Sequence, residues 1–503
     1  MRQMLTRRRV LSLPLIMSIG AKVGLHQRSS VASDGTPVAA GADQAVLDGA
    51  APVDAGALAE LARNRVELAA GWLAGAQRPT GVFYYVYDPV TDTYETTTYN
   101  EVRHAGTTYA LFQAYGLLGH ESILTVAEHA CDWIRRSTVP VRAAGRGFLD
   151  IQNGDISLGG QALALVALLE RRRVTGDTSV DPLIGDLAKF VLWMERDDHT
   201  GRFYNFYIPK TGMRSEMPEV EYYPGEALLA LTRLAEQFPD GPYLDVAKRA
   251  ADFLVHRRDG DIPRAGTVPR EDHWLTIALS ELYRLDNNED FATVAYLQAD
   301  SMIAHQYTAA DGDPERIGGA RSETGTIGFT STATKGEAIV AAWGLAAFRD
   351  DPEGKIRMSL GAQRNAQFQM RVQFTASNTA GFVEPGRTIG GWGANADDPS
   401  IRIDYVQHNM SALIGLAHLS RDGDLPIAMP PAASSDPAPR PSESAAGTPG
   451  ALRKEPGAGT GCPTNPTALD APGRQLPPMG SRWPERFLAT ISDRRRRRTP
   501  DWP

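Results

Sequence analysis

The sequence of 503 residues contains only two cysteines, Cys131 and Cys462. A disulfide framework needs several cysteines, and a thiolate zinc site needs up to four. The fold therefore cannot rest on either of them. After the N-terminal region no apolar run reaches the length of about 18 residues that a transmembrane helix needs, so no internal membrane span is predicted.

The chain also lacks an excess of positive charge. It has 52 basic and 60 acidic residues, a net charge of −8, and so offers no general attraction for phosphate backbones. Nucleic acid is not expected as a partner. No Asp-rich loop with clear ligand spacing is present, so no metal or other cofactor is expected. Hydrophobic residues make up 42% of the chain, enough for a large buried core.

The N-terminus has the shape of an export signal. A basic segment is followed by a short apolar stretch from Val10 to Ala21, too short to cross a membrane as a stable helix. The stretch Thr6-Arg7-Arg8-Arg9-Val10-Leu11-Ser12 resembles the twin-arginine pattern of proteins exported in the folded state. We expect a leader over 1–42 and an exported protein, periplasmic or secreted. A disordered basic N-terminus of a cytoplasmic protein is the alternative.

The other end of the chain has a different composition. Of the 34 prolines, 16 fall within residues 421–503, between Ala, Ser and Gly residues. Such a segment buries too little apolar surface to offset its ordering entropy. We predict a disordered tail over 421–503, ending in five arginines, Arg494 to Arg498.

Between these ends, residues 54–420 show helical spacing of apolar residues almost throughout, with strand-like alternation only in short stretches such as Val82 to Tyr87. The pattern predicts an all-α domain. The twelve expected helices lie near 54–77, 101–117, 119–136, 157–174, 180–196, 223–237, 241–257, 271–285, 288–306, 333–349, 355–373 and 404–420.

Every second helix belongs to a repeat. Six similar helix starts are anchored at Gly106, Gly160, Gly225, His273, Gly336 and Gln407, with a mean spacing of about 60 residues. These helices are apolar nearly all round, as expected of an inner layer, whereas the helices between them carry charge on one face. Six such hairpins close naturally into a ring. We predict an (α/α)6 toroid with short loop strands at its rim; an all-α solenoid is the alternative.

This repeat resembles the six-hairpin toroid superfamily, which includes glycoside hydrolases, sugar epimerases, polysaccharide lyases, terpene cyclases and prenyltransferases. The resemblance rests on architecture and helix starts, so it implies the fold more than the reaction. Zinc-thiolate members are disfavoured by the two cysteines, and the Asp-rich motifs of terpene cyclases are absent. The carbohydrate-active members remain, and the resemblance implies an oligo- or polysaccharide substrate.

The starts of the inner helices should gather at one rim, where unpaired N–H groups favour polar and anionic ligands. Many chemically active side chains fall there. The expected substrate-binding residues are Arg103, His104, Gln161, Glu221, Tyr222, Tyr223, His273, Trp274, Lys335 and Tyr405. Gly-x-aromatic loop stretches at Gly81, Gly145, Gly201 and Gly381 are expected to line the mouth or to form short hairpins on it, and Trp392 is the candidate stacking platform for a sugar ring.

Glu226 and Glu337 each follow a glycine on a helix without a polar face, and a buried charge needs a partner or a function. Hydrolysis of a glycosidic bond needs two carboxyl groups. We expect Glu226 and Asp404 to supply them, with Asp272, Glu337 and Glu221 as substitutes.

Two other functions stay open. A sugar epimerase or lyase needs groups that remove and return a proton, and His104, His273, His408 and Tyr405 have suitable chemistry. A module that binds or assembles a glycan without catalysis would use Arg103, Lys335 and the helix starts.

Overall fold

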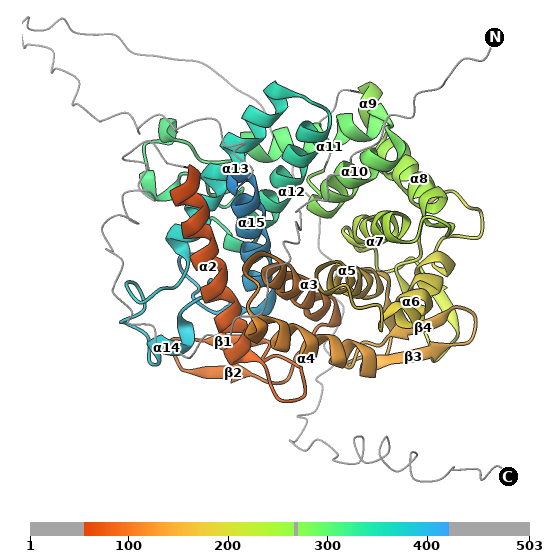
Figure 1. Ribbon diagram of the computed structural model, residues 1–503, viewed down its shortest axis with the longest axis horizontal. Coiled ribbons are helices and arrows are strands. Elements are labelled where there is room, and N and C mark those ends of the chain that lie inside the picture. Colours follow the sequence, from red (N-terminus) through yellow and green to blue (C-terminus); the bar gives the residue numbers. More distant parts are fainter. Residues whose placement is uncertain (1–54, 266–269, 422–503) are drawn as a thin grey trace, which may run out of the picture. The chain divides into compact units, whose positions relative to one another are not determined.

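The computed structural model of the chain describes residues 55–265 and 270–421. The predicted leader at 1–42 and residues 422–503 of the predicted tail lie outside the described residues. The described part is mainly helical, and its long helices alternate between an inner and an outer layer (Figure 1).

The inner layer consists of α3 (Glu101–Leu118), α5 (Leu158–Thr175), α7 (Tyr223–Gln237), α10 (His273–Asp286), α12 (Phe329–Phe348) and α15 (Ile403–Arg421). The outer layer consists of α2 (Ala55–Ala76), α4 (Glu121–Ser137), α6 (Asp181–Trp193), α8 (Tyr243–Phe253), α11 (Glu289–Ala304) and α13 (Pro352–Val372). All twelve expected helices are present.

The inner helices form a closed ring. Each packs on the next in chain order, and α15 packs on α3, so that the last inner helix meets the first. This closure confirms the predicted (α/α)6 toroid over the solenoid alternative. In the described part of the chain, no helix is both long and apolar enough to cross a bilayer.

The burial of the two layers follows their sequence patterns. Every residue of α5 from Leu158 to Arg171 is buried, because other helices or rim loops cover it on all sides. The outer helix α4 buries only one stripe, at Ile123, Ala127, Ala130, Cys131, Trp133 and Ile134. Apolarity all round a helix therefore marks the inner ring correctly.

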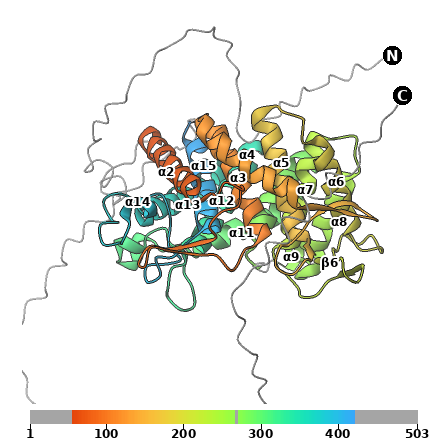
Figure 2. The same ribbon diagram turned by 90° about the horizontal axis from the view of Figure 1, so that it is seen from below.

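Long connections lead from each outer helix to the next inner one, for example 77–100, 194–222 and 373–402, whereas the connections back are short, for example 119–120 and 287–288. Figure 2 shows the longer segments gathered along one side of the ring. They contain η1 (Leu254–Arg258), α9 (Ile262–Ala265), η2 (Ala309–Asp311), η3 (Pro314–Arg316), α14 (Pro385–Thr388) and all of the strands.

The strands form three small antiparallel groups. One joins β1 (Val86–Asp88) to β2 (Thr93–Glu95) and to β8 (Ile401–Arg402), the second pairs β3 (Thr138–Val141) with β4 (Gly145–Phe148), and the third joins β5 (Ile156–Ser157), β6 (Phe206–Ile208) and β7 (Met213–Ser215). The β1–β8 pairing places Val86 opposite Arg402 and thereby joins the connection before α3 to the connection before α15.

Turn glycines seat these connections on the outer helices. Gly81 and Gly201 have φ of 81° and 82°, and a Cβ atom at either would overlap a backbone carbonyl, that of His129 in α4 or of Arg249 in α8. Glycine is required there because it alone accepts both the left-handed backbone and the close approach. Gly381, which opens another of the expected Gly-x-aromatic stretches, has no atom near its would-be Cβ. Gly390, with φ of 96°, approaches the backbone carbonyl of Leu68 in α2 in the way that Gly81 and Gly201 approach their outer helices.

Polar side chains meet across the middle of the ring. Arg233 of α7 forms a bidentate ion pair with Glu281 of α10, at 2.8 and 2.9 Å, and its Nη2 donates to the hydroxyl of Tyr109 on α3 at 3.1 Å. Because α3 is not a neighbour of α7 in the ring, this contact crosses the ring interior.

The start of α12 differs from the prediction. The helix begins at Phe329 rather than near residue 333, because hydroxyls support its first turn: those of Ser331 and Thr332 donate to the carbonyl of Gly328 at 3.0 and 2.9 Å. Glu337 therefore lies in the third turn of its helix, whereas Glu226 lies in the first turn of α7.

Candidate active site

The six inner helices start on the same side of the ring. Glu101 at the start of α3 accepts from the hydroxyl of Ser157, the N-cap of α5, at 2.9 Å. Arg103 of α3 pairs with Asp404 of α15 at 3.0 Å. A Cβ atom on Gly225 at the start of α7 would lie 2.9 Å from the backbone nitrogen of Leu275 in α10. Residues far apart in the sequence thus meet at one rim.

Two histidines meet at this rim from helices that are not neighbours. The rings of His273 on α10 and His408 on α15 have centroids 5.3 Å apart and an edge-on arrangement. Between them in the ring lies α12, whose Glu337 contacts Nδ1 of His408 at 2.7 Å. The cluster of His273, Glu337 and His408 therefore spans the interior of the ring.

Burial controls the charge of this cluster. It holds the pKa of His273 well below its usual value, with His408 and Lys335 adding to the effect, so the imidazole is neutral at neutral pH. The Nε2 atom of His273 is buried without a hydrogen-bond partner. Burial also raises the pKa of Glu337, and the contact with His408 opposes that rise. His273 thus has a ring nitrogen without a hydrogen-bond partner, and the ring of His408 is held by the carboxyl group of Glu337.

Aromatic side chains surround the pair. Trp274 is buried with its ring centroid 4.8 Å from that of His273 and 6.0 Å from that of His408. Tyr222 is 41% exposed and lies edge-on to His273 at 5.6 Å. Three of the residues predicted to bind substrate, His273, Trp274 and Tyr222, are therefore brought together with the predicted catalytic residue His408.

Buried carboxyl groups occupy the α5–α7 side of the rim. Burial raises the pKa of Glu226 to about 8, helped by the charge of Asp272, and the Oε2 atom of Glu226 has no hydrogen-bond partner. Burial likewise raises the pKa of Glu101 to about 7. Both carboxyl groups hold their protons up to near-neutral pH. Tyr223 lies beside them, and its own pKa is raised beyond its usual range by burial and by the charge of Glu226.

Asp272 has a structural task at the start of α10. Its Oδ1 accepts from the backbone nitrogen of Leu275 at 3.0 Å as the helix N-cap, and its Oδ2 pairs with Arg258 at 3.1 Å. Arg258 also pairs with Asp259 at 2.8 Å, so Asp272 belongs to a network of ions. Glu221, also predicted at this rim, lies 3.4 Å from Arg270.

Asp404 is bound by two arginines on the α15–α3 side. Arg402 donates to both of its oxygens, at 2.5 and 2.8 Å, and Arg103 pairs with it at 3.0 Å. Arg402 also lies over the ring of Tyr405 at 4.3 Å, and Arg103 donates to the hydroxyl of Tyr85. Asp404 and Glu226, the pair predicted first for hydrolysis, thus lie on different sides of the rim.

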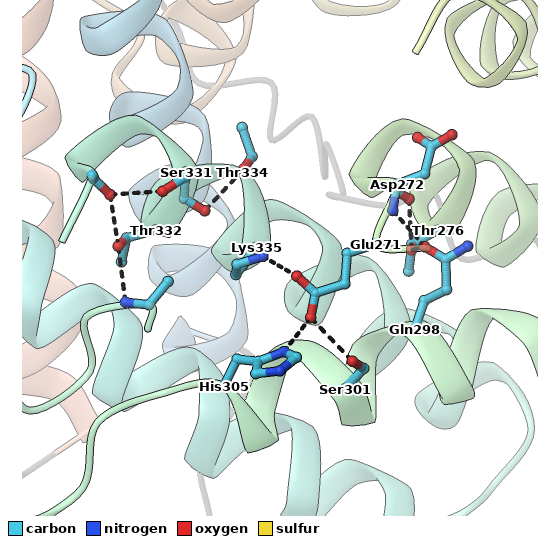
Figure 3. Close-up of polar contacts among 12 residues, drawn as sticks. Glu271, Asp272, Thr276, Gln298, Ser301, His305, Ser331, Thr332, Thr334 and Lys335 are labelled. Carbon is cyan, nitrogen blue, oxygen red and sulfur yellow. Dashed lines mark hydrogen bonds and ion pairs between the residues drawn. The ribbon is translucent and has the colours of Figure 1, made fainter. Parts of the chain in front are cut away.

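Lys335 does not point freely into the rim. It pairs with Glu271, whose carboxylate also contacts Nδ1 of His305 at 2.6 Å and accepts from the hydroxyl of Ser301 at 3.0 Å (Figure 3). In Figure 3 the side chain of Asp272 points away from this group, although it is the next residue in the chain. Glu271 therefore links α10, α11 and α12, with Lys335 as its cation.

Three of the residues expected to bind substrate are enclosed in the protein. His104 is fully buried between the hydroxyl of Tyr99 at 2.6 Å and the carbonyl of Ala130 at 3.0 Å, and burial lowers its pKa to about 3. Gln161 accepts from the nitrogen of Phe148 at 2.5 Å and donates to its carbonyl at 2.8 Å. Trp392 is fully buried, and its indole donates to the carbonyl of Gln369 at 2.8 Å. Their partners are all protein groups, and the placement of Trp392 does not support a stacking role.

Four residues of this rim were not singled out from the sequence: Glu101, Arg258, Glu271 and Arg402. Glu101, Glu271 and Arg402 stand within two residues of predicted site positions, so a wider window around each helix start would have included them. Arg258 lies at the end of η1, and no local signal connects it to Asp272.

The histidine cluster also has the chemistry of a metal site. Within the described residues, His273, Glu337 and His408 each offer one ligand atom, and these atoms lie within 4.8 Å of one another. Two imidazoles and a carboxylate suit a first-row transition metal such as zinc. The same three groups also form an acid–base set without any metal.

No protein-family model matches the chain, and no curated protein matches its sequence. Among solved structures, the chain is similar to cellobiose 2-epimerase from Bacillus thermoamylovorans, with a TM-score of 0.55 and 14% identity over 72% of this chain and 98% of that chain. It is similar to the GH76 α-mannanase of Bacteroides thetaiotaomicron, with a TM-score of 0.51 and 12% identity over 72% and 96% of the two chains. An unsaturated glucuronyl hydrolase specific for heparin has a TM-score of 0.51 and 13% identity over 73% and 99%. These similarities establish the (α/α)6 toroid fold, which the sequence repeat predicted.

Proposed function

We propose that this chain is a carbohydrate-active enzyme that moves a proton beside the carbonyl carbon of a sugar, with His273 and His408 as its acid–base pair. The observation that carries the proposal is the meeting of these two rings across the ring interior, 5.3 Å apart, with Glu337 on one of them. Sugar isomerases need groups that remove and return protons at neighbouring atoms, and epimerases need them on the two faces of one carbon.

The neutral state of His273 and the contacts of His408 fit this chemistry. Neutral His273, with its unpartnered Nε2, is suited to take the proton from C2 of the open-chain sugar. His408, held at Nδ1 by Glu337, is suited to give a proton to the carbonyl oxygen O1. The product of these two transfers is an enediol. His408 then takes the proton of the O2 hydroxyl, and His273 returns its proton to C1, which yields the ketose and restores both histidines.

The contact between the two rings bears on the stereochemistry. Rings this close reach adjacent atoms of one substrate more readily than opposite faces of one carbon. The arrangement therefore favours transfer between C1 and C2 on a single face, which is aldose–ketose isomerisation, over two-faced inversion at C2. Both reactions pass through the enediol and exchange the hydrogen on C2 with solvent.

Proton exchange in deuterated water tests the proposal. Mannose, glucose, cellobiose, glucuronate and glucose 6-phosphate are incubated with the protein, and NMR follows loss of the H2 signal. We expect exchange with at least one sugar and a loss of about 10²–10⁴-fold in rate for His273→Asn or His408→Asn. His120→Asn, at an exposed histidine outside the rim, is the control and should keep the rate. Absence of exchange with every sugar, or unchanged rates in both rim variants, would overturn the proposal.

Hydrolysis remains the second candidate, because one observation favours it. A protonated Glu226 with an unpartnered oxygen has the state that the general acid of a glycosidase requires. Its predicted partner Asp404 is bound by two arginines, which leaves the histidine pair as the better-supported machinery. Release of reducing ends from an oligosaccharide without exchange at C2, abolished in Glu226→Gln, would favour hydrolysis.

Both enzyme types occur among the similar structures. Export to the periplasm or to the medium is a further proposal, and it rests on the sequence of the N-terminal region.

A further inference from the structure

The arginine corner of the rim, made of Arg103, Arg402 and Asp404, carries more positive than negative charge. Two guanidinium groups share a single carboxylate. Asp398, the other carboxylate that acts on Tyr405, is exposed and accepts from the backbone nitrogen of Ser400 in its own turn at 3.0 Å. The corner therefore keeps an uncompensated positive charge at its core.

Both arginines keep donors for a ligand. Nε and Nη2 of Arg402 donate to the carboxylate of Asp404. Nε of Arg103 pairs with the same carboxylate, and its Nη1 donates to the hydroxyl of Tyr85. In residues 55–265 and 270–421, no acceptor contacts Nη1 of Arg402 or Nη2 of Arg103. Their side chains are 26% and 38% exposed, so these free N–H groups face solvent.

The two guanidinium groups are also fixed before any ligand arrives. The β1–β8 pairing holds the backbone of Arg402, and Asp404 binds its guanidinium group. The guanidinium group also lies over the ring of Tyr405, 4.3 Å from the ring centroid. Arg103 is held by Asp404 and Tyr85. Fixed guanidinium groups bind carboxylate or phosphate oxyanions with little further loss of side-chain entropy.

The corner stands next to the histidine cluster. Asp404 and His408 are four residues apart on α15, so they share a helix face, and the rise between them is about 6 Å. That separation is comparable to the length of one sugar ring. A sugar whose C1–C2 end lies at His408 would place its opposite end, C5 and C6, at the arginines.

From this geometry we infer that the substrate is an acidic sugar, whose carboxylate or phosphate group binds Arg103 and Arg402 while its C1–C2 end lies at the histidines. The inference rests on the proposed function for the placement of the reacting end. A carboxylate at C6, as in a uronic acid, and a phosphate on O6 share the oxyanion chemistry that the two guanidinium groups recognise.

Equilibrium binding tests the inference apart from turnover. Glucuronate, glucose 6-phosphate and glucose are titrated into the wild-type protein and followed by calorimetry or ligand NMR. We expect one of the two acidic sugars to bind roughly ten- to hundred-fold more tightly than glucose, the range for hydrogen bonds between charged groups. The preferred acidic sugar tells carboxylate from phosphate. Higher salt should weaken its binding and leave that of glucose unchanged.

Variants identify the corner as the source of the preference. Arg402→Gln should bring the ratio of the affinity for the acidic sugar to the affinity for glucose close to one. Arg402→Lys keeps the positive charge without the bidentate guanidinium group and should retain part of this ratio. Arg264→Gln, at a side chain that is 80% exposed, is the control and should keep the full ratio. Circular dichroism checks that each variant is folded.

The two proposals fail in different ways. Equal binding of acidic and neutral sugars by the wild type, or an unchanged ratio in Arg402→Gln, would overturn the acidic-substrate inference even where proton exchange is found. Preferred binding of an acidic sugar without exchange at C2 would support the subsite and count against the isomerase proposal.

Discussion

The two sides of the rim differ in the charge of their ionisable side chains. On the α15–α3 side, Arg103, Arg402 and Asp404 are ions that contact one another and partly face solvent. On the α5–α7 side, burial raises the pKa of the Glu101 and Glu226 carboxyl groups to about 7 and about 8, so both keep a proton at a pH where an exposed carboxyl group is ionised. One side thus carries permanent charge, and the other carries carboxyl groups that are largely or partly neutral near pH 7. The rim is polarised, and the histidines lie within it.

The largest expected effect tests the neutral side through pH. The pKa of Glu226 is about 8 in the folded protein and close to 4.5 when unfolded, so between these values the folded state binds the extra proton. The free energy of unfolding should therefore fall as pH rises from about 5 to 8, by up to about 1.4 kcal/mol per pH unit. Glu101 should add a similar decline up to about pH 7. Urea denaturation at pH 5, 6.5 and 8 measures this decline.

Glu226→Gln separates this group from the rest of the protein. The amide cannot ionise, so the variant should lose less stability than the wild type over the same pH range. Parallel pH profiles for the two proteins would mean that Glu226 is charged in the folded state, and the contrast between the sides would be lost.

Removing the single carboxylate tests the charged side. Asp404→Asn leaves Arg103 and Arg402 facing each other without a counter-ion. We expect a loss of about 1–3 kcal/mol in unfolding free energy, nearer the lower value because both guanidinium groups are partly exposed. Thermal and urea unfolding measure it, and Asp197→Asn, at an aspartate that is 78% exposed, should stay within about 0.5 kcal/mol. Equal effects of both substitutions would show that the corner is an ordinary surface pair.

The smallest effect concerns packing on the neutral side. A Cβ atom at Gly159 would overlap Oε2 of Glu226 and the ring of Tyr223. Gly159→Ala should cost about 1 kcal/mol, because it crowds the carboxyl group and the ring, and the overlap is relieved only by movement of both side chains. Gly185→Ala on α6 has nothing near the added carbon and should be neutral or stabilising. Equal stability of the two variants would contradict the close packing around Glu226.

The sequence was sufficient for the helices and their layering, because an apolar pattern without a polar face is visible along a helix such as α5. It could not give the rotation of those helices about their axes. Arg103 and His104 are neighbours at the start of α3, yet Arg103 reaches Asp404 on α15 while His104 faces outward to Ala130 on α4. A helix that is buried on all sides carries no pattern that tells these directions apart.

Long-range contacts set the rest of the site. Arg402 is placed by strand pairing with Val86, more than 300 residues earlier. Trp392 lies in a loop that packs on α2, where Gly390 approaches the backbone carbonyl of Leu68. Neither contact has a local signature. The histidine pair was easier to anticipate, since His273 stands at a repeat anchor and His408 directly follows the anchor Gln407, but only the ring closure brings α10 and α15 into register.

The bridge of Arg233, Glu281 and Tyr109 bears on how a substrate would reach the rim. Glu281 lies eight residues beyond His273 on α10, about 12 Å further along the helix. There Arg233 connects it to Tyr109 of α3, a helix that is not a neighbour of α7 in the ring. The bridge therefore narrows the ring interior below the rim. Under the proposed function, a substrate would reach the histidines from the rim, as a free monosaccharide or as the terminal unit of a chain.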